Sequence, residues 1–335
     1  GQLPLSDSSE IFGLHANASI KSAQDEGNAL LAVLLKIQPS DAGSKQGSGS
    51  DPAAAPPLTH AVKDILATLP KLLDVAGVCK KRPPSYQDSM ATVFIQEYFR
   101  YNRLLTAIQS TLQNLLAALD GLVVLSADLE DVGRSVELGL VPMAWSRVGY
   151  PSEKLLGAWY KDLIQRVSFM EAYDHSGVPA VFWISGFFFP QAFLTGALQN
   201  YARKARAAID TITFTFTVMD NAAKDFTQGP VDGVYIDGLF LEGCQWNSSR
   251  GVLVESESRI LFTPFPVMWL RPVVNAPPSQ ESTYTCPVYK TTGRAGTLST
   301  TGHSTNYVLS VEIPTHESED HWVRRGVALI CSLSY

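Results

Sequence analysis

The chain has 335 residues, 45% of them hydrophobic and 17% charged, and its formal net charge is -6 at pH 7. This composition is typical of a folded protein with a large core and excludes wholesale disorder. The acidic balance argues against a general surface for nucleic acid or for an anionic membrane. The length favours two subdomains over one.

The four cysteines are widely separated and form neither a C-x-x-C motif nor a zinc-binding spacing. This usage predicts the reduced thiols of a cytosolic protein. No apolar run reaches the ~18 residues of a membrane-spanning helix. The sequence begins without a methionine or a signal-peptide pattern, so we expect a piece of a longer protein.

Residues 1–27 are expected to form an N-terminal segment that docks onto a neighbouring structure, and a compact apolar helix is predicted from Asn28 to Ile37. Residues 38–57 are rich in Ser, Gly, Ala and Pro, which predicts a flexible loop. Gly43-Ser44-Lys45 within it is not a phosphate-binding loop, because the pattern G-x-x-x-x-G-K-[ST] occurs nowhere in the sequence.

The longest regular element is predicted from Asp88 to Asp120. Its apolar and aromatic side chains alternate steps of four and three residues, at Phe94, Tyr98, Tyr101, Leu105, Ile108, Leu112, Leu115 and Leu119. Such a seam suits either a coiled-coil dimer or a buried helix. Val93, Leu104 and Leu116 widen the apolar stripe, so we favour a central helix buried among its neighbours.

Shorter helices are expected on both sides of it, at 62–73 with an interruption near Pro70, at 124–140, and at 155–170. Gly121 is expected to end the long helix. Trp145 lies on a predicted loop. Ser152 is predicted to cap the next helix, with Glu153 in its first turn.

The stretch from Trp183 to Arg206 (WISGFFFPQAFLTGALQNYARKAR) is the joint of the chain. Apolar residues before it mostly follow a helical period, and those after it mostly follow a strand period. Three adjacent phenylalanines, Phe187, Phe188 and Phe189, cannot all point into one face, so we expect them to wedge two subdomains together. A patch that binds a partner protein is the alternative. Pro190 suits the first turn of a following helix.

From residue 210 onward the period is that of strands. Residues 211–218 alternate between threonine and large apolar side chains. Further strands are expected at 233–243, 251–254, 267–270, 285–290, 306–312 and 326–333. Short strands separated by turn residues predict a small barrel or sandwich. The fold class is therefore α+β, with a helical subdomain over 28–208 and a mostly antiparallel, β-barrel-like subdomain over 209–335.

Three groups of residues resemble catalytic or metal sites without completing one. Gly302-His303-Ser304 lacks the last glycine of a nucleophile elbow, because Asn306 occupies that position. His316 and His321 flank acidic residues, but a solvated loop explains them better than a metal site. Asp237 and Glu242 are too close together and too unsupported to act as a glycosidase pair. The residues themselves predict a non-catalytic module.

The ordered motifs resemble the C-terminal region of dynein heavy chains over nearly the whole length. Those of the first part are Phe12 to Ala18 (FGLHANA), Gln96-Glu97, Arg100 to Asn102, Leu104-Leu105, Val141 to Trp145 (VPMAW), Tyr150 to Ser152 and Trp183 to Arg203. Those of the second part are Ile209-Asp210, Asp232 to Tyr235, Gly238 to Gly243 (GLFLEG) and Arg324 to Ala328 (RRGVA). Cys286 to Thr291 with Gly296 to Asn306 is similar to the axonemal branch more than to the cytoplasmic one. Residues 38–57 depart from the family as an insertion.

This resemblance implies part of a minus-end-directed microtubule motor of the axoneme in a cilium or flagellum. It implies that residues 1–27 follow the last AAA+ module, and that the domain packs on the AAA+ ring of its own heavy chain and tunes motility. ATP and Mg²⁺ would be bound by those modules, with no catalytic residue, cofactor or metal here. Microtubules and the dynein intermediate and light chains would be contacted by other parts of the complex, with no nucleic acid or membrane as partner. The residues expected at the subdomain or ring interface are Trp145, Trp183, Phe187, Phe188, Phe189, Pro190 and Arg203.

Two other classes of function stay open. The protein could be a free-standing module whose barrel binds a peptide or a glycan. It could also be a hydrolase that uses His303 and Ser304.

Overall fold

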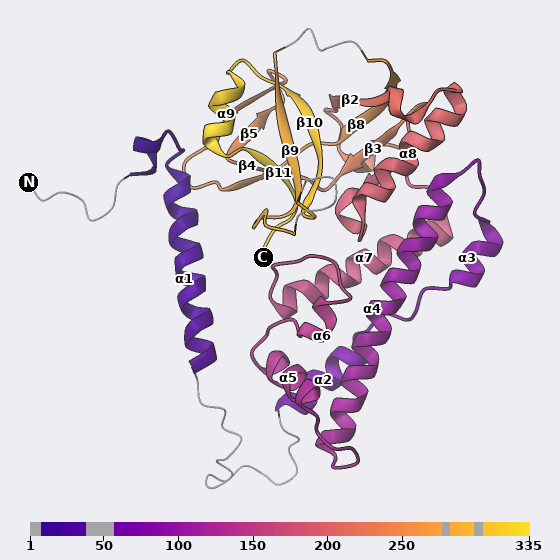
Figure 1. The fold of residues 1–335 in the computed structure, drawn as a ribbon, viewed down its shortest axis with the longest axis vertical. Helices are drawn as coiled ribbons and strands as arrows, with labels where there is room; N and C mark the ends of the chain where they lie inside the picture. Colours follow the sequence, from indigo (N-terminus) through magenta and orange to yellow (C-terminus); the bar gives the residue numbers. More distant parts are fainter. Residues whose placement is uncertain (1–7, 38–56, 277–281, 298–303) are drawn as a thin grey trace, which may run out of the picture.

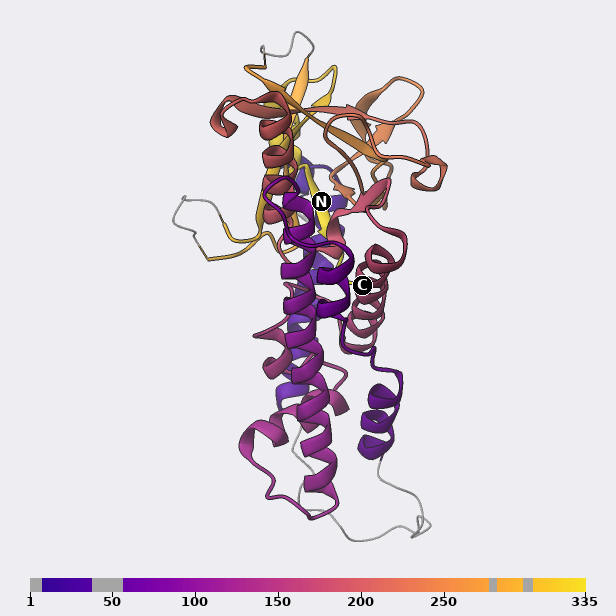
Figure 2. The ribbon, with the colours of Figure 1, turned by 90° about the vertical axis from the view of Figure 1, so that its right-hand side faces the viewer.

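The computed structural model describes residues 8–37, 57–276, 282–297 and 304–335. Long helices form an elongated lower part, and β-sheets form the upper part (Figures 1 and 2). The loop predicted at 38–57 lies outside the described residues apart from Pro57, which begins a helix. The predicted order of a helical part followed by a strand-rich part is confirmed.

The α-helices of the first part are α1 (Asn17–Ile37), α2 (Pro57–Thr68), α3 (Val75–Lys81), α4 (Ser89–Leu119), α5 (Ala127–Glu137), α6 (Met143–Ser146), α7 (Leu156–Ser176) and α8 (Pro190–Ala205). The gap between α2 and α3 contains Pro70, which lacks the N–H that a continuous helix needs. α4 runs along the axis of the helical part and contacts α2, α3, α5, α6, α7 and α8. The prediction of a long helix buried among its neighbours is confirmed.

Local signals at both ends define α4. The carboxylate of Asp88 accepts hydrogen bonds from the backbone N–H groups of Met90 and Ala91, at 2.9 and 3.4 Å. These bonds satisfy donors that have no partner within the helix. At the other end Gly121 has φ = 75°, and the N–H of Leu122 reaches back to the carbonyl of Ala117 at 2.8 Å. Gly121 ends the helix as predicted, because a left-handed residue suits glycine there.

Several predicted helix limits are wrong. The helix expected at 62–73 begins at Pro57, and Trp145 lies on the short helix α6 rather than on a loop. α1 begins at Asn17 rather than Asn28, so the limit placed between residues 27 and 28 falls inside a helix. Ser152 does not cap α7, which begins at Leu156 with no side chain bonded to its first turn as a cap. The hydroxyl of Ser152 instead accepts a bond from the N–H of Lys154 at 3.2 Å, within the preceding loop.

The strands are β1 (Val181–Trp183), β2 (Ile212–Val218), β3 (Val234–Asp237), β4 (Phe240–Glu242), β5 (Cys244–Asn247), β6 (Val252–Glu255), β7 (Phe262–Pro264), β8 (Met268–Val274), β9 (Thr283–Thr291), β10 (Tyr307–Pro314) and β11 (Ala328–Ser332). A short helix, α9 (Glu319–Arg325), precedes β11. Within the described ranges one sheet has the order β1-β3-β8-β2, another has the order β10-β9-β11-β4-β7, and β5 pairs with β6. Most pairs are antiparallel, but β1 with β3 and β11 with β9 are parallel.

The sheets do not close into a barrel in the part of the sequence that the structure describes. The predicted barrel is therefore not confirmed, and the strands form a mixed sheet region instead. β1 belongs to the helical stretch of the sequence, yet it pairs with β3 of the second part. Buried side chains from both parts form one continuous hydrophobic core, so the two parts pack as a unit.

Candidate functional site

The joint between the helices and the sheets is built around an aromatic cluster. Phe187 is 2% exposed, and its ring stacks on Phe193 at 4.7 Å and meets Phe94 edge-on at 5.5 Å. Phe188 is 9% exposed and meets Tyr101 and Tyr150 edge-on, at 4.6 and 5.5 Å. Rings in these orientations attract one another beyond their burial. Both phenylalanines therefore belong to the core at the joint.

A buried carboxylate fixes the backbone of this cluster. Glu97 of α4 is fully buried, and its oxygens accept bonds from the N–H groups of Phe188 at 2.5 Å and Phe189 at 3.3 Å. The guanidinium of Arg100 lies 2.5 Å from the same carboxylate. Burial raises the pKa of Glu97, and the two amides and Arg100 oppose that rise. Glu97 thus fastens the turn before α8 to the central helix.

A buried arginine connects the joint to the sheets. Arg166 of α7 is 3% exposed and donates from Nε to Asp162 at 2.6 Å. Its Nη1 donates to the carbonyl of Ser185. The hydroxyl of Ser185 in turn lies within hydrogen-bond distance of two carbonyl oxygens, those of Gly238 at 2.8 Å and Cys331 at 2.6 Å, and its single hydrogen can be donated to either. A buried charge needs partners of this kind, so the network holds α7, the joint and two segments of the sheet region in one arrangement.

Phe189 differs from its two neighbours because 43% of it is exposed. Arg100 lies 5.6 Å from the centre of its ring, and the amino group of Lys290 lies 5.5 Å from it. Burial lowers the pKa of Lys290. Phe189 therefore does not fit the expectation that all three phenylalanines are wedged between the subdomains, because it lies at the surface beside two cations. For Phe187 and Phe188, which are buried, that expectation stays a prediction.

Most of the other predicted interface residues meet the same cluster. Trp145 is fully buried and stacks on Trp159, which stacks on Tyr150, each at 5.9 Å, and Tyr150 contacts Phe188. Trp183 lies 5.5 Å from Arg166, and Pro190 begins α8 as predicted. Arg203 lies apart, where it donates to the hydroxyl of Ser89 at 2.9 Å and stacks over Tyr86 at 4.5 Å.

Glu153 has a structural role that no sequence signal indicated. Its carboxylate accepts from the N–H of Gly293 at 2.8 Å and from the hydroxyls of Thr291 at 3.0 Å and Thr292. The neighbouring Lys154 donates to the carbonyl of Tyr335 at 2.9 Å. The loop before α7 thus binds the sheet region instead of starting the helix.

The first helix is the most exposed apolar element among the described residues. α1 stands beside the rest of the molecule and touches it near its first turns (Figure 1). Every described side chain from residue 22 to residue 34 is exposed. This length includes Leu30, Leu31, Val33 and Leu34, which are 51% to 61% exposed. A run of exposed apolar side chains of this kind is a candidate interaction surface.

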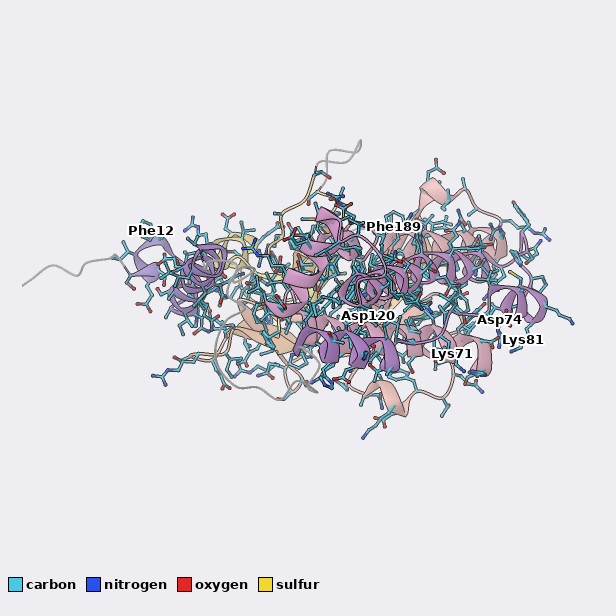
Figure 3. The ribbon with its side chains drawn as sticks, turned by 90° about the horizontal axis from the view of Figure 1, so that it is seen from below. Phe12, Lys71, Asp74, Lys81, Asp120 and Phe189 are labelled. Carbon is cyan, nitrogen blue, oxygen red and sulfur yellow. The ribbon has the colours of Figure 1, made fainter. Side chains whose placement is uncertain are left out.

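Figure 3, seen from below, places Phe12 at the α1 end of the molecule and Lys81 at the opposite end, with Phe189 between them. Phe12 is 66% exposed. The exposed helix and the aromatic joint therefore lie in different parts of the molecule. Among the described residues the first is exposed, whereas Phe187 and Phe188 of the second are buried.

Several of the described residues considered for catalysis or metal binding have structural partners. Asp237 accepts a bond from the N–H of Gly238 at 2.7 Å, and Glu242 pairs with Lys21 and Arg294. His321 contacts Glu255 at 2.7 Å. His303 lies outside the described residues, and the hydroxyl of Ser304 accepts from the N–H of Asn306 at 3.1 Å.

Over the described ranges, His, Cys, Asp and Glu side chains form no group of three or more that could hold a metal ion. The four cysteines are all free, and three of them are buried. No helix in this part of the sequence is long and apolar enough to cross a membrane.

Residues 24–331 match the family model of the C-terminal domain of the dynein heavy chain. The protein belongs to this family, which confirms the resemblance seen in its motifs. Over 333 residues it is 51% identical to human dynein axonemal heavy chain 1, with 99% of this chain and 8% of that protein covered. It is also 45% identical to human dynein axonemal heavy chain 3 over 337 residues, with 99% of this chain and 8% of that protein covered. Human dynein axonemal heavy chain 12 is 42% identical to it, with 99% and 10% covered.

The chain thus spans about a tenth or less of the length of these relatives. Their names confirm the axonemal branch. They also confirm the predicted location, which is the axoneme of a cilium or flagellum.

Proposed function

We propose that this protein is a structural and regulatory domain that packs on the AAA+ ring of its own heavy chain. In this proposal the parent protein is a minus-end-directed microtubule motor, and the domain tunes its motility without binding nucleotide. ATP and Mg²⁺ belong to AAA+ modules elsewhere in the heavy chain. Support comes from the family membership and from a sequence without a phosphate-binding loop.

The exposed face of α1 is the observation that carries this proposal. Leu30, Leu31, Val33 and Leu34 lie on a helix that makes few contacts with the rest of the described residues. Burying the exposed half of each such side chain against a partner contributes about half of the ~1.5–3 kcal/mol that full burial of a fully exposed apolar side chain gives. A ring module with an apolar groove is the partner that this surface fits.

A domain that contacts several ring modules favours those ring states that fit it best. It shifts the populations of these states only by the difference between its affinities for them. A domain with this role needs a fixed internal arrangement. The hydrogen bonds of Glu97 and Arg166 to the segment before α8 provide one. Microtubules and the intermediate and light chains are contacted by other parts of the complex, and neither nucleic acid nor a membrane is a partner.

The test uses the full-length heavy chain. Replacing both Leu31 and Leu34 by glutamate keeps good helix formers in α1 but places charges on its apolar face. We expect the microtubule gliding velocity or the microtubule-stimulated ATPase rate to change by about twofold or more, and twofold corresponds to a coupling energy below 1 kcal/mol. Val231→Glu is the control, because Val231 is 90% exposed and lies outside α1. Unchanged velocity and ATPase rate in the double variant would contradict the proposal.

A second experiment tests the absence of a nucleotide site. The purified chain of 335 residues is incubated with ATP and Mg²⁺. We expect no stoichiometric binding at micromolar concentration, and such binding would contradict the proposal.

The alternative of a peptide- or glycan-binding barrel is not favoured, because the sheets of the described residues do not enclose an interior. A hydrolase based on His303 and Ser304 would need a measured activity that is lost in Ser304→Ala.

A further inference from the structure

A cavity of about 230 Å³ lies where the first turns of α1 meet the sheet region. Asn17 and Lys21 of α1 line one side, and the end of β4 lines another. Arg294 and Arg325 complete the polar part of the wall, and Ile260 contributes an apolar part. A water molecule occupies about 30 Å³ in the liquid, so the volume is large enough for a small polyatomic ligand.

One buried carboxylate lies at the centre of the charges. Glu242 is 7% exposed, and both of its oxygens are used. Lys21 contacts one oxygen, and Nη2 of Arg294 donates to the other at 2.5 Å. The same Nη2 donates to the carbonyl of Gly326 at 2.7 Å. Glu242 therefore neutralises only one of the two cations that it touches.

The third cation, Arg325, is oriented by other groups. Its Nε donates to both oxygens of Glu255, at 2.8 and 3.0 Å, and its Nη1 donates to the carbonyl of Gly13 at 2.7 Å. Three cations thus share two carboxylates, which leaves one positive charge in excess around the cavity. Both guanidinium groups retain N–H donors beyond those used in these bonds.

His15 adds a neutral donor to the same wall. Its Nδ1 accepts a bond from the N–H of Asn17 at 3.1 Å. A neutral ring that accepts at Nδ1 carries its hydrogen on Nε2, so that atom is a donor. His15 is one of the residues that line the cavity.

We propose that this cavity binds a small oxyanion with the chemistry of a phosphate or a carboxylate. Arginine forks match the planar edge of both groups, and a charge-assisted bond of this kind is stronger than a neutral one. The bound anion takes up the excess positive charge and bridges α1 to the sheet region. Glu242 weakens this binding, because its negative charge faces the same cations, Lys21 and Arg294. This site is independent of the proposed contact between α1 and the ring.

The first test titrates inorganic phosphate into the purified protein by calorimetry at constant ionic strength, with succinate in a parallel arm. We expect saturable binding of one anion per molecule, and the arm that binds more tightly identifies the source as phosphate or carboxylate. Arg294→Gln should weaken binding by about tenfold or more, and tenfold corresponds to 1.4 kcal/mol. Arg271→Gln is the control, since Arg271 is exposed and stacks on Trp269 of the same strand, β8, which lies in a different sheet from the β4 strand at the cavity. If Arg294→Gln does not fold, Lys21→Gln replaces it.

The second test removes the resident carboxylate. Glu242→Gln should bind phosphate more tightly than the original protein, by about tenfold, because two cations lose the negative charge that faces them. Phosphate should also raise the melting temperature of this variant more than that of the original protein. If Glu242 only ties α1 to the sheet region, Glu242→Gln should lower the stability of the protein and should not raise its affinity for phosphate. The proposal is overturned if neither anion binds saturably, if Arg271→Gln weakens binding as much as Arg294→Gln, or if Glu242→Gln gains no affinity.

Discussion

Truncating Phe188 to alanine tests how strongly the aromatic joint holds the fold. The side chain is 9% exposed and makes two edge-on contacts, with Tyr101 and Tyr150. Removing a buried phenylalanine costs about 3–5 kcal/mol, because both the burial and the packing around the site are lost. Each aromatic pair contributes ~0.5–1.5 kcal/mol beyond its buried area. We therefore expect a loss of about 4 kcal/mol in the free energy of unfolding.

The loss is measured by thermal unfolding. The entropy of unfolding is ~2.1 cal/mol/K per residue, so over 335 residues a loss of this size lowers the melting temperature by about 6 °C. Phe99→Ala is the matched control, because Phe99 lies on α4 and is 60% exposed. We expect that control to change the melting temperature little. Equal effects of the two truncations, or an unchanged melting temperature for Phe188→Ala, would refute the assignment of Phe188 to the core of the joint.

Three further measurements examine other parts of the fold. The pKa of Glu97 is raised in the folded protein, so the folded state holds the carboxyl proton more tightly than the unfolded state does. The free energy of unfolding should therefore fall as the pH rises above the ordinary value of 4.5 and through the raised pKa. The variant Glu97→Gln should lack this fall, and parallel pH profiles of the two proteins would contradict the prediction. Gly238→Ala should lower the free energy of unfolding by ~1–3 kcal/mol more than Gly251→Ala does. Both glycines have positive φ, but only at Gly238 would the new Cβ lie 2.3 Å from Trp183. Equal losses of the two variants in urea unfolding would count against this contact. Deleting residues 40–55 should change stability little, and a large loss in the same assay would rule out a flexible loop there.

The elements with local signals were predictable from the sequence. The heptad of α4 is visible residue by residue, and Asp88 and Gly121 mark its limits. Pro190 likewise marks the start of α8. The start of α1 at Asn17 has no comparable sequence signal, because residues 19–27 lack a helical period of apolar residues. The amide of Asn17 donates to the carbonyls of Glu257 and Ile260, which are distant in sequence.

The arrangement of the strands could not be predicted from strand patterns alone. β1 has three residues, too few to show a period, and its partner β3 lies beyond α8 and β2. An open sheet and a closed barrel also require the same alternation along each strand. Among the candidate site residues, burial of Phe187 and Phe188 followed from their type, whereas the exposure of Phe189 depends on Arg100 and Lys290. Glu153 was predicted to lie in the first turn of a helix. Its actual partners lie on β9 and the turn after it, which are distant in sequence, so no local pattern could reveal them.

Among the described residues, the bonds that tie α1 to the sheet region come from its first turns, at Asn17 and Lys21, and this end can act as a pivot. Its contacts to the sheet region end near Lys21, and Leu34 lies about 20 Å further along the axis at ~1.5 Å per residue. A rotation of about 10° at that pivot therefore moves the apolar tip by roughly 3 Å, about two residues of helical rise. Small adjustments at the pivot are enlarged at the far end, where a side chain either enters a groove or misses it.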